Sequence, residues 1–116
     1  SGERATRQLL ESEAPPTAII ASSDQMTLAA LETARRMGLD VPGQLSLVSF
    51  DNTPIVRFTQ PPLTAVDQPI AEITARAVDL LIAAKKAGDA AEPAAPVVVP
   101  AGLVERQSTA PPRGTA

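Results

Sequence analysis

The sequence predicts an α/β fold in which parallel strands are flanked by helices. Two short apolar runs rich in β-forming residues, 17–21 and 45–50, indicate strands, and residues 25–37 between them have a helical pattern. A strand, a helix and a second strand within about 35 residues make a βαβ unit, and its right-handed crossover makes the two strands parallel. The chain has 116 residues, 44% of them hydrophobic, which suits one small domain or part of a larger one.

The first half should begin with a helix over 3–13, ended by a pair of prolines that lack the amide donor and clash with the preceding turn. The run 17–21 is continuously apolar, which is typical of a parallel strand buried on both faces. In the helix 25–37 we expect one apolar face, made of Met26, Ala29, Ala30, Ala34 and Met37. Gly38 is placed to end that helix in the left-handed conformation.

The second half opens with an irregular, proline-rich stretch, 52–69, which holds a short candidate strand at 63–66. A second amphipathic helix should span 70–87 and end at Gly88. Its apolar stripe is Ile70, Ile73, Ala77, Leu80, Leu81 and Ala84. After it we expect a linker, two short strands and a polar tail, at 89–96, 97–99, 103–104 and 109–116.

The composition excludes several kinds of chemistry. The chain has no cysteine and no histidine, which removes Cys–His and Ser–His catalysis, zinc fingers and most transition-metal sites. The net charge of −3 argues against nucleic acid as a direct partner of this chain. There is no apolar run long enough to span a bilayer and no signal segment, so we expect no membrane partner. The lack of cysteine suits a reducing cytoplasm.

Polar side chains follow the first two predicted strands, at 22–24 and 51–53. Ligands of open α/β sheets bind at the carboxyl ends of strands, so Asp24 and Asp51 should converge on one edge. Each carboxylate accepts two or more hydrogen bonds, which matches the vicinal hydroxyls of a sugar. Two structural interpretations stay open: Asp24 as a helix N-cap, and Asp51 as a turn residue.

Enzyme alternatives must use the same carboxylates. A phosphoryl-accepting receiver would also need a lysine at a third strand end, but the lysines, Lys85 and Lys86, lie on the predicted helix 70–87. The glycines form neither GxGxxG nor a phosphate loop, and no serine lies in GxSxG. A carboxylate pair for glycoside hydrolysis stays formally open. We expect no catalytic residue, no metal and no cofactor.

A set of motifs then runs along nearly the whole chain. Residues 16–19 and 23–26 are similar to P-T-A-[IV] and N-D-x-[MA], and residues 38–42 are similar to G-L-x-V-P. Residues 45–52 are similar to [IV]-S-[VL]-V-G-[FY]-D-[DN], and residues 61–69 to P-P-L-T-T-[VI]-x-Q-P. In order and spacing this set resembles the LacI/GalR family of bacterial transcription regulators.

The resemblance implies a periplasmic-binding-protein-like (type I) core of two lobes, which in the family follows a short DNA-binding head. Our chain looks like the last third or so of such a regulator, without the head. By resemblance, residues 1–60 belong to the second lobe and 61–69 cross between the lobes. Residues 70–109 would return to the first lobe, and 110–116 form a tail.

The resemblance also implies effector-binding residues: Asp51, Ser23, Asp24 and Gln68. Asp51 matches a strand-end aspartate that hydrogen-bonds the effector, and Asp24 matches an aspartate beside the pocket. Ser23 stands where many members have an effector-contacting asparagine, and Gln68 matches a glutamine near the crossover. Family dimers commonly use the segments that correspond to 25–37 and 52–60.

The function implied is effector sensing and dimerisation in a cytoplasmic regulator, with DNA bound only through the head. The effector would be a sugar or related polyol held between the lobes, and it would act allosterically through the homodimer. The alternative is a sugar-binding transport protein of the same fold. The first lobe would cover the stripe on 70–87, so the 116-residue chain alone should self-associate.

Overall fold

The computed structural model describes residues 1–90 and 92–114, which form two compact units. The first unit contains residues 1–67 together with the described residues from 103 onward, and the second contains residues 68–102. We describe each unit by itself. The first unit carries the helices and strands around which the candidate site is built.

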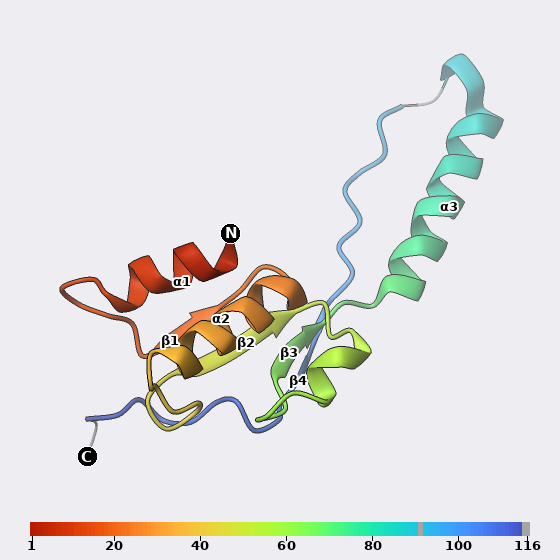
Figure 1. Ribbon diagram of the computed structural model, residues 1–116. Helices are drawn as coiled ribbons and strands as arrows, with labels where there is room; N and C mark the ends of the chain where they lie inside the picture. The colour runs from red at the N-terminus through yellow and green to blue at the C-terminus, as the bar shows by residue number, and fades with distance from the viewer. Residues whose placement is uncertain (91, 115–116) are drawn as a thin grey trace. The chain divides into compact units, whose positions relative to one another are not determined.

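In the first unit, helices alternate with strands as far as β3 (Figure 1). The elements are α1 (Gly2–Leu10), β1 (Ala18–Ile20), α2 (Asp24–Arg36), β2 (Ser46–Phe50), the 3₁₀ helix η1 (Pro54–Arg57) and β3 (Thr64–Asp67). The first helix ends three residues earlier than predicted. Gly38 follows α2 with φ +75°, the left-handed conformation predicted for it.

The sheet has four strands in the order β1-β2-β3-β4, where β4 is Gly102–Val104. β1 pairs with β2 in parallel, Ile19 opposite Leu47, and β2 pairs with β3 in parallel, Ser49 opposite Ala65. The parallel βαβ unit is therefore confirmed. The prediction that β1 is buried on both faces is wrong, because β1 lies at the edge of the sheet and Ile20 is 71% exposed.

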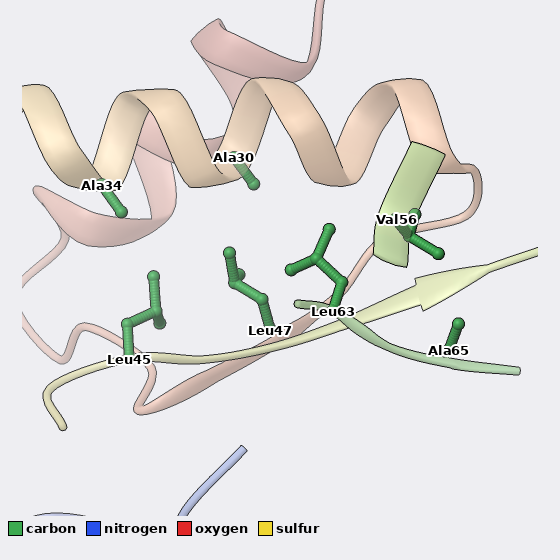
Figure 2. Close-up of a cluster of buried hydrophobic side chains, with 7 residues drawn as sticks. All are labelled: Ala30, Ala34, Leu45, Leu47, Val56, Leu63 and Ala65. Atoms are coloured by element: carbon green, nitrogen blue, oxygen red, sulfur yellow. The ribbon is translucent and has the colours of Figure 1, made fainter. Parts of the chain in front are cut away.

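The core of the first unit lies between α2 and the strands (Figure 2). Small side chains of α2, Ala30 and Ala34, face the larger Leu45 and Leu47 of the β2 segment, which allows the helix to approach the sheet closely. The remaining members of this cluster are Val56, Leu63 and Ala65. The two phenylalanines are not among these residues, so the core is aliphatic, as the composition implied.

The buried face of α2 differs from the predicted apolar stripe. Thr27 and Thr33 are buried, whereas Met26 is 36% exposed. Each threonine hydroxyl donates to a helix carbonyl four residues back, Thr33 to Ala29 O at 2.7 Å, so its polar atom is satisfied inside the core. α1 packs beside α2, where a Cβ on Gly2 would lie 2.9 Å from the Ala29 Cβ.

Residues 106–110 hold the ends of β2 and β3. Ser108 is fully buried; its Oγ accepts from the Thr64 amide at 2.8 Å and donates to the Leu47 carbonyl. The Leu47 amide donates in turn to the Ser108 carbonyl at 2.9 Å. The start of the predicted polar tail is also part of the packed unit, because the Ala110 amide donates to Ser46 Oγ at 3.0 Å.

The second unit contains α3 (Ile70–Ala87) and the 3₁₀ helix η2 (Gly88–Ala90). The bounds of α3 match the predicted helix 70–87, and Gly88 caps it with φ +56°. The predicted strand at 97–99 is wrong: these residues are irregular, and together with α3 they line a groove. In the described part of the chain, no helix is both long and apolar enough to cross a bilayer.

Candidate functional site

A hollow of about 410 Å³ lies in the first unit, where β1 and β2 end. Its walls come from the start of α2 and from the loop that follows β2. The lining residues are Ser23, Asp24, Gln25, Leu28, Asp51, Thr53 and Ile55. The structure thus brings together the two strand-end segments, and both polar and aliphatic side chains line the hollow.

Ser23 is the N-cap of α2. Its extended backbone precedes the helix, and its Oγ accepts from the Met26 amide at 3.3 Å. The interpretation of Asp24 as the N-cap is therefore wrong, since Asp24 is the first residue inside the helix. Ser23 presents its side chain at the wall of the hollow while it also stabilises the helix start.

Asp24 is 5% exposed, and both of its carboxylate oxygens are engaged. One oxygen accepts from the Ser49 hydroxyl on β2, and the other accepts from the Thr53 amide at 2.7 Å. Burial acts to raise the pKa of Asp24, but the hydrogen bonds from Ser49 and Thr53 together outweigh it and hold the pKa below its usual value. Asp24 therefore carries a charge that ties the helix start to the loop after β2.

The loop after β2 has an unusual backbone at two successive residues. Asp51 has φ +109° and Asn52 has φ +58°, both in the region that favours glycine. Asparagine tolerates this region, but an aspartate at φ +109° costs conformational energy, of order 1–3 kcal/mol. The Asp51 amide donates to Val66 O at 3.1 Å, so the turn stays attached to β3.

Arg106 is a residue at this edge that the sequence analysis did not select. Its guanidinium donates to the Asn52 side-chain oxygen at 2.7 Å and to the Leu63 carbonyl at 2.6 Å. The Asn52 amide group donates to Asp67 Oδ1 at 3.0 Å. Since 54 residues separate Arg106 from Asn52, no local pattern in the sequence signals this contact.

Gln68 belongs to the second unit, so its place relative to the hollow stays a prediction. Within the described residues, no group of three acidic, cysteine or histidine side chains is placed to hold a metal ion. The polar side chains that line the hollow carry two carboxylates, two hydroxyls and one amide, and Leu28 and Ile55 complete the lining. The polar side chains of such a surface can hydrogen-bond the hydroxyls at the edge of a polyhydroxylated molecule. The aliphatic side chains can pack on an apolar face of the same molecule.

Comparison with known proteins gives the family. Residues 1–109 match the sequence profile of a periplasmic binding protein-like domain. The transcriptional repressor CytR of Escherichia coli K12 is 46% identical over 82 residues, which cover 71% of this chain and 24% of CytR. A LacI-family regulator from Bifidobacterium animalis subsp. lactis superposes with a TM-score of 0.81 at 37% identity, covering 97% of this chain and 40% of that one.

A complex of the transcriptional regulator CelR with cellobiose superposes with a TM-score of 0.78 at 34% identity, covering 93% of this chain and 32% of CelR.

The fold and the strand-end site therefore define a periplasmic-binding-protein-like domain. The chain belongs to the LacI family of transcription regulators and corresponds to the C-terminal part of the family's effector-binding core. It spans about a quarter of the length of the curated relatives. The relatives named here are regulators, not enzymes.

Proposed function

We propose that this chain is part of the effector-sensing core of a transcription regulator, and that its effector is a sugar or related polyol. The observation that carries this proposal is the hollow at the strand ends, where Ser23 and Asp51 are both among the lining residues. The complex of CelR with cellobiose supports a sugar as the class of effector. DNA would be bound by a separate head, in the cytoplasm, and the effector would change the affinity of that head for DNA.

In this proposal Asp51 is the main hydrogen-bond acceptor for the effector hydroxyls, and Ser23 is a second contact. Asp24 lies beside the effector, as the family resemblance implies, and its contribution is to hold the wall of the hollow, because both of its oxygens are engaged within the protein. Gln68 would approach the effector from the connection between the lobes.

The test uses two variants of the full-length protein, Asp51→Gly and Asp51→Asn, titrated by calorimetry with neutral mono- and disaccharides, cellobiose and ribose among them. Glycine suits φ +109°, so Asp51→Gly removes the carboxylate without adding backbone strain. Loss of a charged hydrogen bond should weaken sugar binding roughly 10- to 150-fold. The unfolding free energy should stay equal or rise, because the strain at residue 51 is relieved.

A matched control is Asp89→Ala, which removes an exposed carboxylate from the second unit and should leave sugar affinity unchanged. Equal sugar affinity in wild type and Asp51→Gly would rule out Asp51 as a ligand. A large loss of stability in Asp51→Gly would instead assign Asp51 a purely structural role.

We also propose that α2 and the segment 52–60 form a homodimer interface. Large apolar side chains are exposed there: Phe58 is 84% exposed and Ile55 is 51% exposed. The neighbouring Leu28 and Leu31 of α2 line a shallow depression with Thr59 and Gln60. Glu32 and Arg35 complete the lining of this depression, and an exposed aromatic side chain next to mixed aliphatic and polar surface is typical of protein interfaces.

Phe58→Ser in the full-length protein should weaken dimerisation. Burial of a phenylalanine side chain contributes about 1.5–3 kcal/mol, so the dissociation constant should rise about 10- to 150-fold in sedimentation experiments. Leu103→Ser, at a site 66% exposed and outside this surface, serves as the control. An unchanged dissociation constant in Phe58→Ser would place the interface elsewhere.

A further inference from the structure

Arg106 joins two segments that are far apart in the sequence. Its guanidinium donates from Nη1 to the Leu63 carbonyl at 2.6 Å and from Nη2 to Asn52 Oδ1 at 2.7 Å. Its own backbone amide donates to Thr64 Oγ1 at 3.0 Å. The planar fork of an arginine can serve two acceptors at a fixed angle, which a lysine ammonium on a flexible stem cannot reproduce.

Asn52, the partner of Arg106, is held from both ends of its side-chain amide. Its oxygen accepts from Arg106, and its nitrogen donates to Asp67 Oδ1 at 3.0 Å. The backbone amides on either side are also bound: Asp51 N donates to Val66 O at 3.1 Å and Thr53 N donates to Asp24 Oδ2 at 2.7 Å. These bonds hold the turn whose two residues have positive φ.

We propose that Arg106 is a positioning residue for effector binding: through Asn52 it holds the strained turn that presents Asp51 at the hollow. The inference rests on the proposed function of Asp51. It adds a role for a residue that does not line the hollow itself. Without the bond from Arg106, the turn should relax toward backbone angles that an aspartate prefers, and Asp51 would leave the hollow wall.

The position of this network along the chain extends the inference. Asp67 is the last residue of the first unit before the chain passes to residues 68–102, and Arg106 lies three residues after the chain returns at Leu103. The Asp51 turn is therefore bonded to the segments just before the outgoing connection and just after the returning one. Occupation of the hollow should consequently alter the hydrogen bonds of both connecting segments.

The first experiment follows amide hydrogen exchange in the full-length protein and needs no ligand. In Arg106→Gln, the amides of Asp51 and Thr53 should exchange at least roughly tenfold faster, while the amides of the core strand β2 keep their rates. Arg4→Gln is the matched control, since it removes the same charge from an exposed site on α1. Unchanged exchange at Asp51 and Thr53 would overturn the positioning role.

The second experiment is a double-mutant cycle with Asp51→Gly, read by calorimetric titration with the sugar of the panel that binds wild type most tightly. Arg106→Gln alone should weaken binding roughly tenfold, and Arg106→Lys less than that. In the Asp51→Gly background no side chain remains to be positioned at residue 51. There, Arg106→Gln should weaken sugar binding less than about twofold. Equal losses in both backgrounds would show that Arg106 does not act through Asp51.

The two proposals fail in different ways. If Asp51→Gly leaves sugar affinity unchanged, or no sugar binds, the proposed function fails, and the exchange experiment still decides whether Arg106 holds the turn. If Asp51→Gly weakens binding but Arg106→Gln does not, the proposed function stands and the role of Arg106 is overturned.

Discussion

At the scale of single residues, the buried carboxylate of Asp24 decides the geometry of the candidate site. It is reached from β2 by the Ser49 hydroxyl and from the following loop by the Thr53 amide. The single proton of the Thr27 hydroxyl is shared between the Ser49 hydroxyl, at 2.8 Å, and the Ser23 carbonyl, at 2.9 Å, so α2, β2 and the loop share one buried polar network. Because each member is satisfied, the network fixes the loop at little cost in desolvation.

Asp24→Asn should lower the free energy of unfolding by about 1–3 kcal/mol at pH 7, because a charged acceptor becomes a group with only one acceptor oxygen. Since the folded-state pKa of Asp24 is lowered, its charge stabilises the fold above the usual pKa of 3.8. This contribution is lost as the pH falls through the lowered folded-state pKa. The difference between wild type and Asp24→Asn should therefore shrink below about pH 4 in denaturant titrations.

Glu32→Gln provides the comparison for this prediction. The bond from Arg36 lowers the pKa of Glu32, but the pair lies at the surface and is screened by solvent. Its replacement should change the unfolding midpoint clearly less than Asp24→Asn does. A constant difference between wild type and Asp24→Asn from pH 7 to pH 2 would show that the charge of Asp24 does not stabilise the fold.

At the scale of secondary-structure elements, Ser23 combines two tasks at the start of α2, and substitutions can separate them. Ser23→Ala removes the N-cap and should cost about 1 kcal/mol in unfolding free energy, whereas Ser23→Gly should cost only a few tenths. If the hydroxyl also contacts the effector, both variants should lose the same sugar affinity despite their different stabilities. If the loss of sugar affinity instead parallels the loss of unfolding free energy in the two variants, Ser23 acts only as a helix cap.

The ends of α2 and α3 were predictable from glycine, whereas α1 ends three residues before the bound predicted from the proline pair. Gly38 and Gly88 end α2 and α3 with positive φ, which residues with a Cβ rarely adopt. The buried face of α2 was predicted less well, because the predicted apolar stripe does not include its threonines. Thr27 and Thr33 are nevertheless buried, since their hydroxyls bond to helix carbonyls and their methyl groups pack in the core.

The candidate site was predictable only in part. The convergence of Asp24 and Asp51 follows from parallel strands that end at one edge of a sheet. The roles of Asn52 and Arg106 depend on a contact across 54 residues, and on a backbone conformation at residue 51 that propensity disfavours for aspartate. Such features arise from tertiary structure, so residue patterns along the chain do not reveal them.

At the scale of the whole molecule, the second unit carries apolar surface that its own residues do not bury. None of the residues of α3 is buried; Leu81 is 70% exposed and Ile70 is 59% exposed. Residues 97–99 cover part of one side, where they line a groove of about 440 Å³ with Ile73, Ala77 and Leu80. Soluble monomers rarely expose a contiguous aliphatic surface of this kind.

We therefore predict that the 116-residue chain on its own self-associates at micromolar concentration through α3. Burial of each large aliphatic side chain contributes about 1.5–3 kcal/mol, so two or three contacts per protomer suffice for a micromolar complex. Leu81→Glu should shift the sedimenting species toward monomer, because a charge would be buried without a partner. Ala75→Glu adds the same charge on the opposite side of α3 from the predicted stripe and should have little effect. Sedimentation of the unaltered chain as a compact monomer would contradict the prediction, and equal effects of the two glutamates would move the contact off this stripe.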